Sequence, residues 1–273
     1  MAVPRNALVT GAGSGMGRLA AQRLAAAGAT VAALDIDAAA LATTCDHAPK
    51  LRPYVCDVAD RAAVDRTVRS ARQDLGVVDR LVHAAGIPSA GPLAQQNPNE
   101  IRQVIDINLM GTIHLVQAVV PDMIRSGGGE VVLFGSMGGW IPSAHAGAYS
   151  ASKAGVHAIA EALTGECQDL GIRVVCVCPP LVETPMAEWG RRTHPELIGQ
   201  ARGISPADVL DAVEHTLTAR GLYVFPGRGT TTLWRARRFA PGLLRGLIDR
   251  KLRGGTGFGP RQPHLPTADG EGT

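Results

Sequence analysis

The sequence predicts an α/β protein with a doubly wound parallel sheet of about seven strands and helices on both faces. Two observations support this prediction. Short apolar runs alternate with amphipathic helical stretches along most of the chain, and such alternation is typical of parallel sheets with right-handed crossovers. In addition, a glycine-rich turn at residues 10–17 separates the first apolar run from an alanine-rich helical stretch.

The amino-terminal strand, turn and helix predict a dinucleotide-binding unit. Residues 7–10 form a short β-branched run, and residues 18–27 have a helical pattern after the turn. In a Rossmann-like fold, the N–H groups at the start of such a helix meet a pyrophosphate. Glycines allow the tight turn and the close approach of the cofactor. We therefore expect dinucleotide binding at Gly11, Ser14, Gly15, Met16 and Gly17.

The residue after the second predicted strand indicates which cofactor binds. Residues 30–34 form a second apolar run, which ends at Asp35. A carboxylate at this point accepts hydrogen bonds from ribose hydroxyls but repels a 2′-phosphate. Neither Ser14 nor Ile36 supplies the basic side chain that would attract that phosphate. The sequence therefore favours NAD over NADP, with one alternative left open, that Asp35 caps a helix beginning near Asp37.

The remaining elements follow in order along the chain. We expect strands at residues 51–56, 77–82, 130–134, 172–178 and 222–225, and helices at residues 60–75, 98–124 and 147–170. The third strand is followed by Asp57, where a carboxylate can reach the adenine amino group. The fourth leads into a turn of small residues, His83 to Gly86.

Composition places the chain among ordinary globular proteins. The 273 residues are 45% hydrophobic and carry a net charge of +3, which predicts neither disorder nor a nucleic-acid partner. We expect no transmembrane helix and no signal peptide. The five cysteines have no zinc-binding spacing, so we expect no metal. Cys176 and Cys178 point to one sheet face and are expected to pack as small apolar residues, in a reducing cytoplasmic location.

Tyr149 and Lys153 are the strongest candidates for catalysis. They are four residues apart in a predicted helix, so their side chains lie on one face. A cation beside a phenol lowers the pKa of that phenol, which would let Tyr149 exchange protons near neutral pH. Lys153 is one of only three lysines, which indicates a role that arginine does not fill. Ser136 lies thirteen residues before the tyrosine.

Together these residues resemble the classical short-chain dehydrogenase/reductases over about residues 4–227. The matching motifs are Thr10, Gly11, Gly15 and Gly17; Asp57; Asn108; Ser136; Tyr149 and Lys153; and the segment Pro179 to Thr184.

The resemblance implies hydride transfer between a nicotinamide cofactor and a secondary alcohol or ketone. Tyr149 would exchange the proton, Ser136 would bind the substrate oxygen and Lys153 would hold the ribose. Asn108 would hold a water that links Lys153 to solvent. Further cofactor contacts are expected at Val58, Ala84, Ala85, Gly86, Pro179, Val182 and Thr184. The family also implies a homo-oligomer, a dimer or tetramer formed through the two long helices.

Two residues depart from the family pattern. His83 stands where the family usually has an asparagine that braces the sheet, so it must find another hydrogen-bond partner. Pro180 replaces a glycine after Pro179, which restricts φ and removes an N–H near the nicotinamide. A modest change in cofactor affinity is expected.

The substrate is predicted only by class. Substrate contacts are expected at Ser136, Trp140, His145, Tyr149, Met186 and Trp189, and this apolar, aromatic set favours a hydrophobic alcohol or ketone. Two alternatives stay open: an NADPH-dependent ketoreductase, and a non-catalytic dinucleotide-binding sensor or scaffold.

The carboxyl-terminal part differs from the rest in composition. Beyond the dehydrogenase domain at residues 4–230, residues 231–253 read as a basic amphipathic extension. Its helix could pack on the body, cover the pocket, meet another subunit, contact an anionic membrane through residues 234–253, or simply be solvated. Residues 254–273 are rich in Gly and Pro and are expected to be disordered.

Overall fold

The computed structural model describes residues 3–242, apart from the side chains of residues 196 and 197. The chain divides into two compact units, Met1–Trp234 and Arg235–Thr273. Within the described residues, the predicted extension is represented only up to residue 242. The predicted amphipathic helix beyond it and the predicted disordered tail lie outside them.

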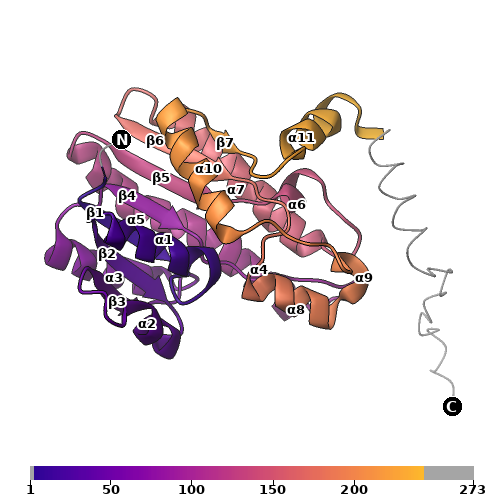
Figure 1. Ribbon diagram of the computed structural model, residues 1–273, viewed down its shortest axis with the longest axis horizontal. Coiled ribbons are helices and arrows are strands. Elements are labelled where there is room, and N and C mark those ends of the chain that lie inside the picture. Colours follow the sequence, from indigo (N-terminus) through magenta and orange to yellow (C-terminus); the bar gives the residue numbers. More distant parts are fainter. Residues whose placement is uncertain (1–2, 243–273) are drawn as a thin grey trace, which may run out of the picture. The chain divides into compact units, whose positions relative to one another are not determined.

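The first unit is built on a seven-stranded parallel sheet, which confirms the predicted Rossmann-like fold (Figure 1). The strand order is β3-β2-β1-β4-β5-β6-β7, with the crossover between β1 and β4. The strands are β1 (Asn6–Thr10), β2 (Thr30–Asp35), β3 (Leu51–Val55), β4 (Arg80–His83), β5 (Gly129–Phe134), β6 (Ile172–Val177) and β7 (Tyr223–Val224). Ligands bind at the carboxyl ends of the strands beside such a crossover, and the predicted motifs are found at this edge.

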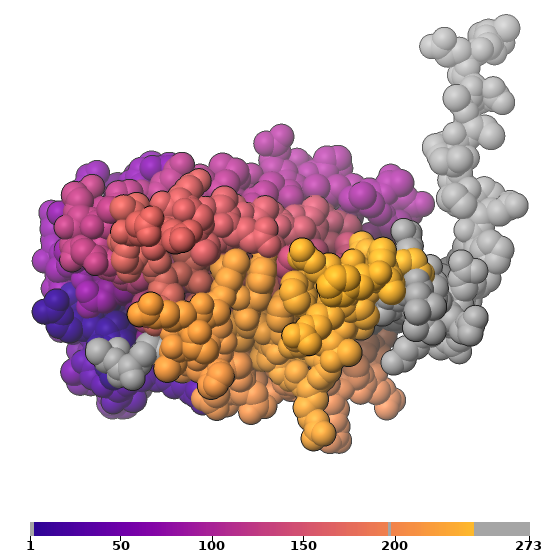
Figure 2. All heavy atoms as spheres, turned by 90° about the horizontal axis from the view of Figure 1, so that it is seen from above, coloured from indigo at the N-terminus to yellow at the C-terminus, as the bar shows by residue number. Residues whose placement is uncertain are grey.

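Helices cover both faces of the sheet. One face packs against α3 (Arg61–Leu75), α5 (Gly111–Arg125) and α7 (Gly147–Glu166), and the other against α1 (Gly15–Ala26), α2 (Ala38–Cys45) and α10 (Pro206–Ala219). Each face buries its own apolar core. In Figure 2 the orange surface of α10 adjoins the pink surface of the segment around β6, on which this helix packs.

Alternation along β6 divides its side chains between the two cores. Val174 and Cys176 belong to the core under α7, whereas Val175 and Val177 belong to the core under α10. Successive residues of a strand point to opposite faces. Cys178, the residue after β6, continues the same alternation and joins Cys176, so these two cysteines share a face as predicted.

The long helix predicted over residues 98–124 is interrupted in the structure. It consists of α4 (Pro98–Ile105), a π-helical turn η1 (Asp106–Met110) and α5. A π-helical turn accommodates one extra residue and is frequent at functional sites. The stretch Pro98–Arg125 is long and apolar enough to cross a membrane, but Leu115 and Met123 are fully buried against the sheet, as expected for a core helix.

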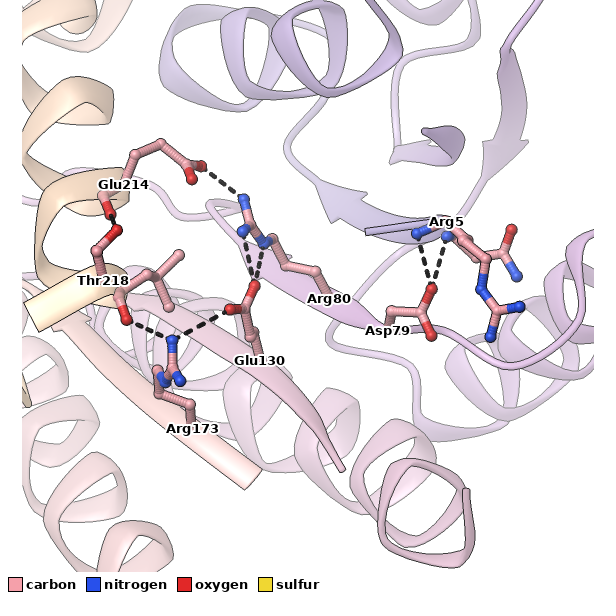
Figure 3. Close-up of polar contacts among 9 residues, drawn as sticks. Arg5, Asp79, Arg80, Glu130, Arg173, Glu214 and Thr218 are labelled. Atoms are coloured by element: carbon pink, nitrogen blue, oxygen red, sulfur yellow. Dashed lines mark hydrogen bonds and ion pairs between the residues drawn. The ribbon is translucent and has the colours of Figure 1, made fainter. Parts of the chain in front are cut away.

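An ion-pair network ties the amino-terminal ends of the strands together (Figure 3). Arg80, the first residue of β4, is buried and pairs with Glu130 on β5 and Glu214 on α10, both at 2.6 Å. Arg173 on β6 approaches the other oxygen of Glu130 at 3.5 Å. This network lies at the edge of the sheet opposite to the carboxyl-terminal ends of the strands, so it serves the fold rather than the cleft.

The remaining helices are short or lie near the end of the described chain. They are α6 (Met137–Trp140), α8 (Pro185–Thr193), α9 (Pro195–Ile198) and α11 (Thr230–Phe239). Trp234 of α11 stacks on Phe225 with ring centroids 5.0 Å apart and meets Trp140 edge-on at 6.0 Å. This tryptophan therefore packs against aromatic residues within the first unit.

Candidate active site

Two adjoining cavities form one cleft at the carboxyl ends of the strands. The first has a volume of about 250 Å³ and is lined by the glycine turn, and the second, of about 340 Å³, is lined by the Ser136 and Tyr149 region. Residues that line both are Met16, Ala84, Gly86, Thr184 and Met186. The cleft thus joins the predicted dinucleotide site to the predicted catalytic residues.

The glycine turn has the geometry that a pyrophosphate site requires. Gly11 has a φ of +66°, and a Cβ added there would lie 2.8 Å from the backbone nitrogen of Ala85. At Gly17 an added Cβ would lie 2.2 Å from the carbonyl oxygen of Gly11. The side chain of Ser14, at the N-cap of α1, makes no capping hydrogen bond. Because the first N–H groups of α1 have no side-chain cap, they suit an anionic group, so these residues fit a dinucleotide.

Asp35 lies beside this turn and lines the first cavity. One carboxylate oxygen accepts a hydrogen bond from the N–H of Gly13 at 2.7 Å, and the other accepts from the N–H of Asp37 at 3.1 Å. Asp37, and not Asp35, caps α2 through the N–H groups of Ala39 and Ala40. The alternative that Asp35 caps this helix is therefore not what the structure shows, and its carboxylate lines the cavity next to the glycine turn.

The structure also places the remaining predicted cofactor contacts along the cleft. Asp57 accepts a hydrogen bond from the N–H of Ala59 at 2.9 Å. The first cavity is lined by Asp57, Val58, Ala84, Ala85 and Gly86, and the second by Pro179, Val182 and Thr184. Pro180 lines the second cavity as well, so the departure from the family pattern is in the wall of the site.

Tyr149 and Lys153 both reach the second cavity from α7, on one helix face as predicted. The Nζ atom of Lys153 lies 6.0 Å from the centroid of the Tyr149 ring. The same Nζ donates a hydrogen bond of 2.8 Å to the carbonyl oxygen of Phe134, at the end of β5. Two residues further on, Ser136 accepts a hydrogen bond from the N–H of Gly138 at 3.0 Å and also lines the cavity.

The pKa shifts of this pair differ from the sequence-based expectation. Burial raises the pKa of Tyr149, and a hydrogen bond with Ser136 only partly opposes that effect. Burial also lowers the pKa of Lys153 to about 8. The expected lowering of the tyrosine pKa is therefore wrong for the cofactor-free protein, because desolvation outweighs the charge of an ammonium group 6.0 Å from the ring.

Asn108 is positioned behind the catalytic pair by the π-helical turn. Its side-chain oxygen accepts from the N–H of Ile87 at 2.8 Å, and its nitrogen donates to Ile87 O and Ser152 Oγ, both at 3.0 Å. A Cβ added at Gly86 would lie 3.1 Å from the Asn108 oxygen and 3.3 Å from Lys153 Nζ. Asn108 and Lys153 therefore approach the same glycine, with no room there for a larger residue.

His83, which replaces the family's usual asparagine, has a hydrogen-bond partner in Thr10. Its Nδ1 lies 2.7 Å from Thr10 Oγ1, which also accepts from the N–H of Ala85 at 3.2 Å. The buried Nε2 has no hydrogen-bond partner among the described residues. Burial, with the nearby charge of Lys153 as a smaller cause, lowers the pKa of His83 to about 3. His83 is thus a neutral, structural histidine at neutral pH.

The predicted substrate residues separate into two groups. Met186 and Trp189 line the second cavity together with Ser136 and Tyr149. Contrary to the sequence-based expectation, Trp140 does not line it, because its ring stacks on His157 with centroids 4.7 Å apart. His145 is also outside this lining. It has a φ of +66°, and its carbonyl oxygen accepts from the N–H of Gly91 at 2.7 Å.

Three residues that were not predicted as site residues, although Thr10 belongs to the glycine motif, support the site from behind. Thr10 links His83 to Ala85, Ser152 holds Asn108, and His157 accepts a hydrogen bond from the N–H of Ser136 at 3.3 Å. His157 lies four residues after Lys153, on the same face of α7. That spacing is the signal from which its place near the site could have been found.

Comparison with known proteins agrees with this geometry. The sequence pattern of the short chain dehydrogenases matches residues 5–194. The 2-(R)-hydroxypropyl-CoM dehydrogenase of Xanthobacter autotrophicus is 34% identical over 224 residues, which cover 77% of this chain and 89% of that protein.

Two solved structures share the fold. A variant of actinorhodin polyketide ketoreductase with NADPH has a TM-score of 0.77 and 30% identity, covering 82% of this chain and 97% of the other. A short-chain dehydrogenase/reductase of Burkholderia phymatum in complex with NAD has a TM-score of 0.78 and 26% identity, covering 88% and 94%.

The fold and the cleft define a nicotinamide dinucleotide-binding oxidoreductase that acts on CH–OH groups. The chain belongs to the short-chain dehydrogenase family.

Proposed function

We propose that the protein transfers a hydride between NAD(H) and a hydrophobic secondary alcohol or the corresponding ketone. The observation that carries this proposal is the continuity of the cleft. Asp35 lines one cavity, Tyr149, Lys153 and Ser136 line the other, and Gly86 and Thr184 line both. This continuity supports a ribose contact at Asp35 and a proton donor at Tyr149 along one dinucleotide.

Three residues that line the second cavity have a chemical task in this proposal. Bound nicotinamide supplies the acceptor or donor of the hydride. In reduction, Tyr149 donates its phenolic proton to the carbonyl oxygen, and in oxidation its phenolate form takes the proton of the alcohol. Ser136 donates a hydrogen bond to the substrate oxygen, where negative charge develops. Lys153 holds the ribose hydroxyls and keeps a positive charge near the phenol.

The preference for NAD rests on Asp35. Its carboxylate accepts hydrogen bonds from the backbone N–H groups of Gly13 and Asp37 and, among the described residues, forms no ion pair with a cationic side chain. A 2′-phosphate placed beside it would bring two negative charges together in a partly buried site. NADP is the alternative cofactor, because the similar actinorhodin polyketide ketoreductase was crystallised with NADPH.

The substrate class follows from the lining of the second cavity. Its walls are mostly apolar, with Met137, Leu181, Met186, Trp189 and Ile198 around the polar atoms of Ser136 and Tyr149. Apolar walls with few convergent polar groups are typical of sites for hydrophobic small molecules. This composition supports an alicyclic or similarly apolar alcohol or ketone over a sugar.

A panel of secondary alcohols and ketones, assayed by NADH absorbance, tests the reaction. We expect turnover of apolar members with NAD(H) and little with small polar ones. Asp35→Ala should reduce the ratio of NAD to NADP efficiency (kcat/KM), whereas Asp46→Ala, at an exposed position after α2, should leave it unchanged. An unaltered ratio in Asp35→Ala would remove the cofactor assignment. Binding of NADH without turnover of any member would favour the non-catalytic sensor instead.

A further inference from the structure

A compact group of three potential metal ligands lies outside the proposed reaction. His157 is on α7, Cys176 is on β6, and Cys178 follows that strand. Their relative exposures are 4%, 0% and 0%. Their ligand atoms all lie within 4.8 Å of one another. None of the three belongs to the catalytic set, although the cluster adjoins it through the hydrogen bond from Ser136 N–H to His157.

We propose that His157, Cys176 and Cys178 form a binding site for a single thiophilic d10 metal ion, either zinc or monovalent copper. This proposal does not depend on the proposed reaction, because it concerns a separate set of side chains. It also replaces the sequence-based expectation that these cysteines pack only as small apolar residues.

Two of the three separations between the ligand atoms match those around one ion, and the third is within 4.8 Å. Zinc binds sulfur at about 2.3 Å and imidazole nitrogen at about 2.0–2.1 Å with tetrahedral angles. These values place two sulfur atoms about 3.8 Å apart and a sulfur and a nitrogen about 3.5 Å apart. The observed separations are 3.9 Å between the two Sγ atoms and 3.4 Å between Cys178 Sγ and His157 Nε2. An ion can therefore lie between these atoms if His157 Nε2 exchanges its hydrogen bond from the N–H of Ser136 for the metal.

Two glycines beside the cluster, Gly135 and Gly139, leave room for the imidazole of His157. A Cβ added at Gly135 would lie 2.5 Å from His157 Nε2 and 3.3 Å from Cys176 Sγ. At Gly139 it would lie 2.6 Å from Cε1 of the same ring. Any larger residue at these positions would displace the imidazole, so the two glycines fix the ring where its Nε2 faces the sulfur atoms.

Both thiols would lose their protons when a metal binds. The thiolate is the form of cysteine that binds metals. Binding would therefore release the thiol protons of Cys176 and Cys178 to solvent and replace them with the ion.

The number of donors and the covering residue limit the choice of ion. Among the described residues the cluster supplies three ligands. Three donors of this kind suit monovalent copper, whereas zinc would add a water as its fourth ligand. Trp140 stacks on the imidazole and donates its indole N–H to Cys178 Sγ at 3.4 Å. Since Trp140 is only half-buried, movement of its ring would open a path for the ion.

A competition titration of the reduced, metal-free, full-length protein tests the site. Zinc and, under anaerobic conditions, monovalent copper are each added in the presence of a chromophoric chelator. We expect one equivalent of at least one ion to bind with a sub-micromolar dissociation constant. Affinity should fall at least 100-fold in Cys176→Ala and in Cys178→Ala. The matched controls Cys56→Ala and Cys167→Ala remove buried cysteines outside the cluster and should leave the affinity unchanged.

X-ray absorption spectroscopy identifies the atoms bound to the ion in the wild-type protein, so this test does not require any variant to fold. We expect two sulfur scatterers at about 2.3 Å and one nitrogen scatterer at about 2.0–2.1 Å for zinc. Nitrogen and oxygen scatterers alone would overturn the proposal. So would the absence of stoichiometric binding of both ions, or unchanged affinity in a folded Cys178→Ala protein.

Discussion

The Nζ atom of Lys153 lies 6.0 Å from the ring centroid of Tyr149 while it donates a hydrogen bond to the carbonyl oxygen of Phe134. The lysine is therefore anchored to the end of β5, next to the segment that carries Ser136. One hydrogen bond thus connects α7, which carries Tyr149, to the end of β5, which leads to Ser136.

The first prediction concerns the proton exchanged at Tyr149. Tyr149→Phe removes the hydroxyl group and keeps the ring in its place between α7 and the cavity. We expect kcat to fall by about 10²- to 10⁴-fold, the range for loss of a general acid or base. The dissociation constant of NADH, measured by fluorescence, should change less than about threefold, since the ring remains. Tyr54→Phe, far from the cavity on β3, is the control.

Activity retained in Tyr149→Phe would mean that another group exchanges the proton. A large loss of NADH affinity in the same variant would instead place Tyr149 chiefly in cofactor binding.

The second prediction concerns the cost of burying Lys153. Its pKa falls from 10.5 to about 8, so between these values the unfolded chain binds more protons and stability rises with pH. Below pH 8 the buried lysine is protonated, and its burial lowers the free energy of unfolding by up to about 3 kcal/mol. Lys153→Met removes the charge but also the hydrogen bond to Phe134. We expect the free energy of unfolding of the cofactor-free protein to rise by about 1–2 kcal/mol at pH 7.

Urea unfolding at pH 7 and pH 10 checks this sign. The gain in Lys153→Met should shrink at the higher pH, because the wild-type lysine is then neutral when folded. Lys50→Met, at an exposed lysine, should show no such pH dependence. Equal destabilisation at both pH values would mean that the lost hydrogen bond and packing outweigh the cost of desolvation.

Local sequence patterns predicted most of the fold and the positions of the candidate site residues, but not the direction of the pKa shift of Tyr149. Apolar runs and glycines placed the strands, the turn at residues 10–17 and Asp35 correctly, because each depends on neighbours in the sequence. The i, i+4 spacing also placed Tyr149 and Lys153 on one face of α7. By contrast, the direction of the Tyr149 pKa shift depends on burial by distant elements, which no local pattern reports.

Contacts between distant segments account for the other differences. Trp140 was expected at the substrate, but Cys178 and His157 offer its indole a hydrogen-bond acceptor and a stacking surface. The π-helical turn that positions Asn108 could not be predicted from a glycine or proline, because Asp106–Met110 contains neither. These features follow from tertiary packing, so they could be found only in the structure.

The third prediction concerns acid stability and His83. Its pKa is lowered from 6.5 to about 3, so the unfolded chain binds an extra proton between these values and stability falls as the pH drops below 6.5. The loss reaches about 2 kcal/mol at pH 5. His83→Asn keeps a group that can bond to Thr10 and removes the titration. We therefore expect its unfolding free energy to depend less on pH, by about that amount between pH 7 and pH 5.

Denaturant titrations at the two pH values measure this difference, with His47→Asn, at an exposed histidine, as the control. An identical pH dependence in wild type and His83→Asn would show that His83 is not the group responsible.

The last prediction concerns the ion-pair network at the opposite edge of the sheet (Figure 3). The side chain of Arg80 is 3% exposed, that of Glu130 is 20% exposed and that of Glu214 is 52% exposed. Removing one partner of a buried pair leaves a charge without compensation, whereas an exposed pair contributes little. Glu130→Gln should therefore cost about 2–4 kcal/mol of unfolding free energy, and Glu214→Gln less than about 1 kcal/mol. Because the network is remote from the cleft, both folded variants should keep the kcat/KM of the wild type. Equal losses in the two variants would mean that water reaches Arg80 and replaces either partner.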